Sequence, residues 1–136
     1  MFVDTNVLLD VVLNRKSYVD YARLLLNFGW EGRFDLFTSS VSLVNTHYIV
    51  QSNAGKSAGM KAVIHLKEIM DILNVDHEMI NLAIACEPTD FEDAVQYFSA
   101  KAANCEVIVT RDRKGFKGFQ LPIQTPKEFL KTLERA

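Results

Sequence analysis

The chain begins MFVDTNVLLD, residues 1–10, and this stretch decides the fold. Residues 1–3 form a short apolar run, as expected of a buried strand, and the run ends at Asp4. Apolar residues then recur at helical spacing across residues 7–12. A strand followed at once by a helix predicts an α/β protein with the Asp4 carboxylate at the end of its first strand.

The same alternation of strand and helix continues along the chain. Because strands that alternate with helices form parallel sheets, we predict a three-layer α/β/α fold whose central parallel sheet has four or five strands. The length fits one domain, residues 1–136. Pro122 marks the last strand as an edge strand. The further strands are expected at residues 34–38, 73–75, 107–110 and 121–124.

Capping residues and glycines suggest where the helices begin and end. The last helix combines an N-cap at Thr125 with a first-turn proline and a capping glutamate. Residues 53–59 form the most flexible-looking connection. Ser39 or Ser40 can cap the third helix, and capping boxes are expected at Ser17–Asp20 and Thr89–Glu92. Helices are expected at about residues 18–28, 41–49, 60–72 and 77–86, then from residue 90 to 102 and from 126 onward.

Composition describes an ordinary globular chain and nominates no partner. Apolar residues make up 49%, charged residues 24%, and the net charge is −2. Cys86 and Cys105 are expected to be reduced core thiols, because neither has a second cysteine at metal-ligand spacing. The sequence shows no signal peptide and no membrane span, so we expect a cytoplasmic protein.

Four acidic residues lie where predicted strands end or helices begin: Asp4, Asp90, Asp93 and Asp112. Ligands of open α/β sheets bind beyond the carboxyl ends of the strands, so these carboxylates are expected to share one crevice. Crowded carboxylates need a counter-ion, and Mg²⁺ or Mn²⁺ bound there can activate water against a phosphodiester. The alternative for each acid taken singly is a helix cap or a turn, and Asp10 is expected to be solvated or locally bonded.

Four strings in chain order resemble a PIN-domain ribonuclease: VDTNVLLD, DFEDAVQYFSA, VIVTRDRKGF and LPIQTPKEFL. The resemblance covers essentially the whole chain and is strongest to the bacterial VapC-like branch, found among the toxins of toxin–antitoxin pairs. It implies a metal-dependent endoribonuclease with Mg²⁺ or Mn²⁺ as cofactor and RNA as substrate. It also implies a homodimer and an inhibitory antitoxin partner.

The resemblance also implies roles for individual residues. Asp4, Asp93 and Asp112 correspond to the catalytic, metal-binding acids of the family. Thr5, Asn6 and Asn45 correspond to supporting positions, and we expect Asp90 and Thr110 to support the site as well. Independently of the resemblance, the basic residues Arg111, Arg113 and Lys114 flank Asp112 and are expected to bind RNA phosphates, with a solvated loop as the alternative.

One position departs from the family pattern. The family has a glutamate in the helix after the second strand, and the corresponding stretch SSVSLVNTHYIV offers Asn45. An amide contributes no negative charge, so a second metal would bind less well. The alternative function is therefore a catalytically weak RNA-binding or antitoxin-binding module. A receiver-like or phosphatase site on Asp4 is disfavoured, because no second acid lies beside it, and the three histidines are assigned no role.

Overall fold

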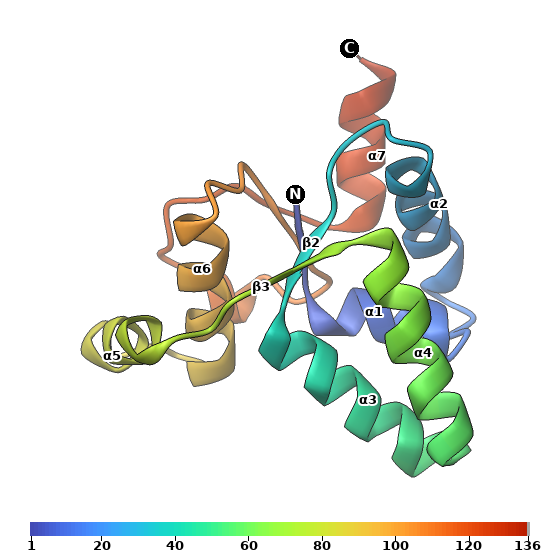
Figure 1. The fold of residues 1–136 in the computed structure, drawn as a ribbon. Coiled ribbons are helices and arrows are strands. Elements are labelled where there is room, and N and C mark those ends of the chain that lie inside the picture. Colours follow the sequence, from blue (N-terminus) through green and yellow to red (C-terminus); the bar gives the residue numbers. More distant parts are fainter. Residues whose placement is uncertain (136) are drawn as a thin grey trace.

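The computed structural model describes residues 1–135 and contains a five-stranded parallel sheet, in the order β3-β2-β1-β4-β5 (Figure 1). Every strand pairing in it is parallel, and β5 lies at an edge, as predicted. The predicted α/β class and parallel sheet are confirmed, with five strands. The strands are β1 (Phe2–Val3), β2 (Phe37–Ser39), β3 (Asp71–Leu73), β4 (Ile108–Val109) and β5 (Ile123–Gln124).

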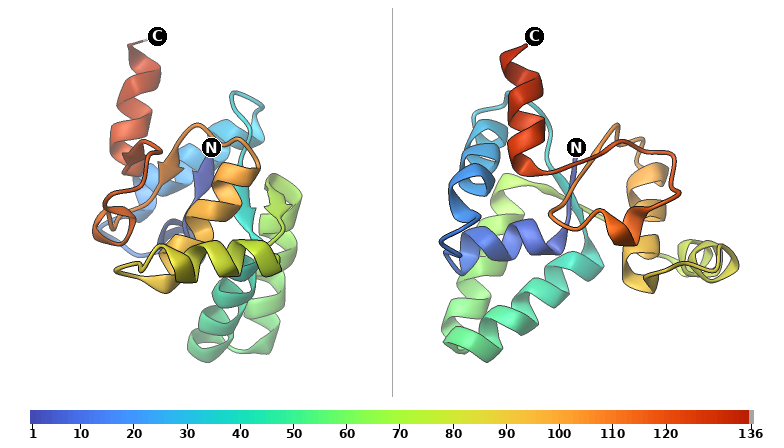
Figure 2. Two further views of the ribbon diagram at one scale, coloured as in Figure 1. Left: turned by 90° about the vertical axis from the view of Figure 1, so that its left-hand side faces the viewer. Right: turned by 180° about the vertical axis from the view of Figure 1, so that it is seen from behind.

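Helices cover both faces of the sheet. In Figures 1 and 2, α1, α2, α4 and α7 lie on one side, whereas α6 lies on the other side with α5 outside it. No helix in residues 1–135 is long and apolar enough to cross a membrane. The helices are α1 (Thr5–Val12), α2 (Val19–Trp30), α3 (Ser40–Ala54), α4 (Lys56–Ile69), α5 (His77–Ala85), α6 (Phe91–Ala102) and α7 (Pro126–Glu134), with a short 3₁₀ helix η1 (Lys114–Phe116).

The central strands carry apolar side chains on both faces. Phe2 packs with the core beneath α6, and its neighbour Val3 packs with the core beneath α1 and α2. Ile108 and Val109 divide in the same way. Because successive side chains of a strand point to opposite faces, two residues per strand are enough to join the two cores. The sheet is thereby held rigidly enough to position the side chains that lie beyond its carboxyl ends.

Some predicted boundaries are wrong, and a one-residue turn at Gly55 explains the largest error. Residues 53–59 are almost entirely helical, because Gly55 has a φ of 94° and reverses the chain between α3 and α4 in one residue. The following helix and β3 consequently come earlier than predicted, at Lys56–Ile69 and Asp71–Leu73.

The predicted caps have mixed outcomes. Ser39 caps α3 and Thr125 forms the capping box of α7, as predicted. The Ser17–Asp20 box is wrong, since α2 begins after Tyr18 without a side-chain cap. The Thr89–Glu92 box is also wrong, because Asp90 caps α6 and accepts a hydrogen bond from Asp93 N. Cys105 is buried as predicted, but Cys86 is exposed rather than in the core.

Candidate active site

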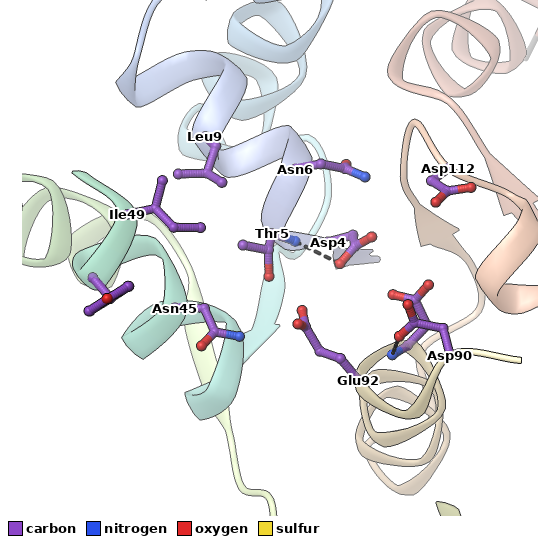
Figure 3. A pocket seen from close by; sticks show the side chains of 11 residues that line it. Asp4, Thr5, Asn6, Leu9, Asn45, Ile49, Asp90, Glu92 and Asp112 are labelled. Carbon is purple, nitrogen blue, oxygen red and sulfur yellow. Dashed lines mark hydrogen bonds between the residues drawn. The ribbon is translucent and has the colours of Figure 1, made fainter. Parts of the chain in front are cut away.

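The carboxyl ends of β1 and β4 open into a cavity of about 480 Å³ that we call the acidic pocket. Side chains from the starts of α1 and α6 and from α3 surround it, as Figure 3 shows. This is where open α/β sheets bind their ligands. The lining residues are Asp4, Thr5, Asn6, Leu9, Asn45, Tyr48, Ile49, Asp90, Glu92, Asp93 and Asp112.

Asp4 is the N-cap of α1 and is only 4% exposed. Its Oδ1 accepts a hydrogen bond from Thr5 N at 2.7 Å, and its Oδ2 accepts one from Thr110 Oγ1 at 2.8 Å. Burial raises the pKa of Asp4 to about 6, although both hydrogen bonds act in the opposite direction. Each carboxylate oxygen has a further lone pair, so the capping role leaves Asp4 able to bind a cation.

Thr110 connects the end of β4 to the start of α1. While it donates to Asp4, its hydroxyl accepts hydrogen bonds from Asn6 Nδ2 at 3.2 Å and from Asp112 N at 3.1 Å. Asn6 Oδ1 accepts in turn from Arg111 N at 3.2 Å. Asn6 and Thr110 therefore fix the two strand ends that carry Asp4 and Asp112.

The start of α6 brings a second group of acids to the pocket. Asp90 Oδ1 accepts from Asp93 N at 2.9 Å, which is the capping bond of α6. Partial burial, followed by the negative charges of Asp4, Asp90 and Glu92, raises the pKa of Asp93 to about 7. Raised pKa values that have burial and like charge as their causes are typical of functional carboxylate clusters.

A buried polar network holds the three helices around the pocket. Thr5 Oγ1 donates to Ser42 Oγ at 2.8 Å, and Gln96 Nε2 donates to the same oxygen at 2.6 Å. Ser39 Oγ donates to Gln96 Oε1. The network joins α1, α3 and α6, and all four side chains are buried. The sequence analysis did not predict this network. The residue that could have indicated it is Gln96, a buried glutamine one turn after Asp93 in α6.

Comparison with known proteins identifies the family, since residues 1–114 match the PIN domain. The chain belongs to the PIN-domain family. It is 31% identical over 138 residues to Ribonuclease VapC1 of Aquifex aeolicus (strain VF5), across 95% of this chain and 92% of that protein. The predicted resemblance to the VapC-like branch of the PIN domains is thereby confirmed.

Solved structures share the PIN fold at lower sequence identity. Mycobacterium tuberculosis VapC20, a Sarcin-Ricin loop cleaving toxin, superposes with a TM-score of 0.71 at 16% identity, over 88% of this chain and 95% of that one. DNA-bound VapBC from Salmonella typhimurium superposes with a TM-score of 0.71 at 17% identity, over 92% and 96%. These likenesses confirm the fold alone.

The PIN domain of this chain has an amide at one corner of the acidic pocket. Asn45 lines the pocket from α3, as predicted, and Tyr48 and Ile49 add apolar surface beside it. Figure 3 shows the Glu92 carboxylate reaching from α6 toward the side of the pocket that holds Asn45. Sequence reasoning treated Glu92 as a capping residue, and the shift of the N-cap to Asp90 leaves it free to line the pocket.

The predicted RNA-binding residues have different surroundings. Arg111 forms an ion pair with Asp10, and Arg113 pairs with Glu128. Lys114 is exposed, and its backbone N–H donates to Asp112 Oδ1 at 3.0 Å. Asp10 is fully buried, so the first of its two expected states, a solvated side chain, is wrong. Its carboxylate accepts from Arg111 and also lies 3.5 Å from the nearby Arg15, which fits the second state, a locally bonded side chain.

The acidic pocket suits a hydrated divalent cation. In the described part of the chain, no three Asp, Glu, His or Cys side chains converge into a ready-made set of ligands. Mg²⁺ keeps several of its waters and needs few direct protein ligands, so it does not require such a set. The donors are hard carboxylate oxygens, and burial raises the pKa values of Asp4 and Asp93, so a cation bound beside them would favour their charged forms. The donor chemistry therefore fits Mg²⁺ or Mn²⁺.

Proposed function

We propose that this PIN domain is a metal-dependent endoribonuclease that hydrolyses RNA phosphodiester bonds at the acidic pocket. The observation that carries the proposal is the meeting of Asp4, Asp93 and Asp112 in one pocket, at the sheet edge expected for an α/β enzyme. The family and the relative Ribonuclease VapC1 support ribonuclease chemistry.

In this proposal Asp4, Asp93 and Asp112 hold one Mg²⁺ or Mn²⁺ ion. Such an ion supplies a bound water of lowered pKa and neutralises charge on the phosphate. Thr5 and Thr110 hold the Asp4 carboxylate through its two oxygens. Asp90 keeps Asp93 in place by capping α6.

The polar residues around the acids have supporting roles. The Asn6 amide donates to the Thr110 hydroxyl and accepts from the Arg111 backbone N–H. These two hydrogen bonds fix it at the pocket wall. Asn45 lies on the α3 side of the pocket, where it can hydrogen-bond to a metal-bound water or to phosphate. Lys114, whose backbone N–H donates to Asp112 Oδ1, offers an exposed cation for the RNA backbone.

Single substitutions of the central acids test the proposal. Wild-type protein with Mn²⁺ or Mg²⁺ should cleave a labelled single-stranded RNA, and EDTA should stop cleavage. Asp4→Asn and Asp93→Asn should each lower kcat/KM at least about 100-fold, because each removes a negative charge from the proposed ion site. Asp20→Asn, an exposed substitution on α2, is the matched control and should cleave as wild type does. Unchanged turnover in both acid variants would reject the assignment.

A second candidate is a module that binds RNA or an antitoxin without useful catalysis. Asn45 supports this alternative, since an amide stands at a corner where the family has a glutamate. Calorimetry with Mn²⁺ separates the two candidates. Heat of binding at micromolar to millimolar Mn²⁺, lost in Asp4→Asn, favours the enzyme, whereas no binding at millimolar Mn²⁺ favours the module.

We also propose that the protein works with partners of its own kind and with an antitoxin. Related proteins support this: VapBC2 of Rickettsia felis was crystallised on a DNA fragment of its promoter, and a toxin–antitoxin complex is known from Klebsiella pneumoniae. A homodimer is proposed on the same family grounds. Light scattering of the purified chain, and co-expression with the gene next to its own, test these two proposals.

A further inference from the structure

A second cavity, of about 380 Å³, lies beside the acidic pocket and has a different chemistry. It is formed where α1 leads into α2, where the chain leaves β4, and at the start of α7. Its walls carry two tyrosines and two cationic side chains, and we call it the tyrosine pocket. Its principal lining residues are Asp10, Ser17, Tyr18, Tyr21, Arg111 and Lys127.

A buried ion pair fixes the guanidinium of Arg111 in the wall of the tyrosine pocket. Arg111 Nε donates to Asp10 Oδ2 at 2.6 Å, and its second nitrogen donates to Asp10 Oδ1 at 3.1 Å. The Asp10 side chain is fully buried, whereas that of Arg111 stays 26% exposed. Arg15 Nη1 lies 3.5 Å from Asp10 Oδ1, so two cations surround one carboxylate and this cluster keeps a net positive charge.

Each tyrosine in the pocket lies against a cation and stays accessible. The Arg111 guanidinium carbon lies 3.8 Å from the centroid of the Tyr18 ring, and Lys127 Nζ lies 5.5 Å from that of Tyr21. The exposed fractions of Tyr18 and Tyr21 are 46% and 45%. Aromatic rings and arginine planes are the surfaces on which unstacked RNA bases pack, and a lysine nearby can pair with a phosphate.

The tyrosine pocket and the acidic pocket share a wall. Arg111 N donates to Asn6 Oδ1 at 3.2 Å, and Asn6 lines the acidic pocket. Asn6 and Asp10 are four residues apart on α1, so they lie on the same face one turn apart. Arg111 also directly precedes Asp112. One hydrogen bond and one helical turn therefore connect the walls of the two pockets.

We propose that the tyrosine pocket binds a nucleobase of single-stranded RNA next to the nucleotide whose phosphate lies at the acidic pocket. The inference rests on the proposed ribonuclease function and adds to it a base-binding subsite. The base stacks against Tyr18 or Tyr21, and Lys127 pairs with the adjoining phosphate. Stacking accepts every base, so the subsite contributes affinity and position more than sequence choice.

Photocrosslinking tests this subsite without any cleavage. The wild-type protein in EDTA is irradiated with a single-stranded oligouridylate that carries 5-iodouridine, and crosslinked peptides are mapped by mass spectrometry. Crosslinks at Tyr18 or Tyr21 support the proposal. Crosslinks confined to other residues, or none, overturn it.

Affinity measurements with matched variants give a second readout. Tyr18→Leu and Tyr21→Leu should raise the Kd for the same RNA roughly 5- to 150-fold. Trp30→Leu is the control, because Trp30 is another exposed aromatic residue of α2 and should leave the Kd unchanged. Lys127→Gln should weaken binding, and Lys131→Gln, on the same helix, should not. Equal Kd values for wild type and both tyrosine variants, with circular dichroism showing them folded, would overturn the subsite.

The outcomes separate this inference from the proposed function. Cleavage of RNA with Mn²⁺, together with no crosslink at the tyrosines, rejects the subsite and keeps the ribonuclease. Crosslinks at the tyrosines without cleavage under any metal keep the subsite and reject the ribonuclease.

Discussion

In the acidic pocket, the pKa of Asp93 is raised further above its ordinary value than that of Asp4. Asp93 is partly buried, and its carboxyl group is near those of Asp4, Asp90, Glu92 and Asp112. Burial and these like charges raise its pKa to about 7 from an ordinary value of 3.8. The same pocket that attracts a cation therefore destabilises the metal-free fold at neutral pH.

The raised pKa predicts how the stability of the metal-free protein depends on pH. A carboxyl group whose pKa is higher in the folded chain binds its proton more tightly when folded, so folding is favoured at low pH. For Asp93 that contribution is lost as the pH rises from about 4 to about 7. Urea unfolding in EDTA should therefore show wild type losing stability between pH 5 and pH 8. Asp93→Asn should flatten this change and be more stable than wild type at pH 8 by roughly 1–2 kcal/mol, after allowance for solvent screening.

A second acid provides the control for this variant. Asp20→Asn changes an exposed acid on α2 and should follow the wild-type curve between pH 5 and pH 8. An Asp93→Asn protein that is less stable than wild type at pH 8 would contradict the prediction, because it would show that the Asp93 carboxylate makes a net favourable contact in the metal-free fold.

At the scale of elements, the short helix η1 packs against the start of α6, with Gly115 next to Asp93. Gly115 is buried, and a Cβ added to it would overlap Asp93 Oδ2 and lie 2.6 Å from Asp93 Cγ. Real Cβ atoms do not approach other atoms so closely, so a side chain at residue 115 would force the Asp93 carboxylate or η1 to move. The loop after β4 therefore lies directly against Asp93, an acid of the proposed ion site.

Gly115→Ala should displace the Asp93 carboxylate, η1 or both. Overpacking of this kind costs about 1–3 kcal/mol of stability, and displacement of Asp93 should weaken Mn²⁺ binding measured by calorimetry. A double-mutant cycle with Asp93→Ala identifies the contact, since removing the carboxylate should make Gly115→Ala less costly, with a coupling of about 0.5–3 kcal/mol. Strictly additive costs would show that Gly115 is needed for a reason other than Asp93.

Elements were predictable where a local rule and the tertiary packing agree. The capping box of α7 and the N-cap of α3 each depend on residues that are close together in the sequence, and both were predicted. The single-residue turn at Gly55 was not, because a run of glycine, serine and lysine reads as a loop unless the partner helix is known. Asp90 and Thr89 are both good caps, so the sequence could not decide between them.

At the scale of the whole molecule, the sheet decides which distant residues meet. Parallel strands place Asp4 and Asp112 at one edge although they are far apart in sequence, and that meeting was predictable from strand ends alone. The links through Thr110 and Gln96 were not, because a hydrogen bond between side chains depends on orientation that no spacing rule supplies. The pairing of Asp10 with Arg111 was missed for the same reason.

The charge distribution of the molecule predicts a shallow salt dependence of RNA binding. The net charge is −2, so long-range attraction is weak and binding depends on local cations. The cations near the two pockets are Arg15, Arg111, Lys114 and Lys127. Arg15 and Arg111 share the Asp10 carboxylate and count as one net charge, so three net charges remain. If each neutralises one phosphate, log Kd for single-stranded RNA should rise with log salt with a slope of about 2, at roughly 0.7 per phosphate. Fluorescence anisotropy in EDTA, between 50 and 200 mM KCl, should then show affinity falling no more than about 20-fold. Lys127→Gln should lower the slope by about 0.7, and Lys131→Gln should leave it unchanged.

A slope above about 5 would mean that RNA lies over another, more basic face and not along these two pockets.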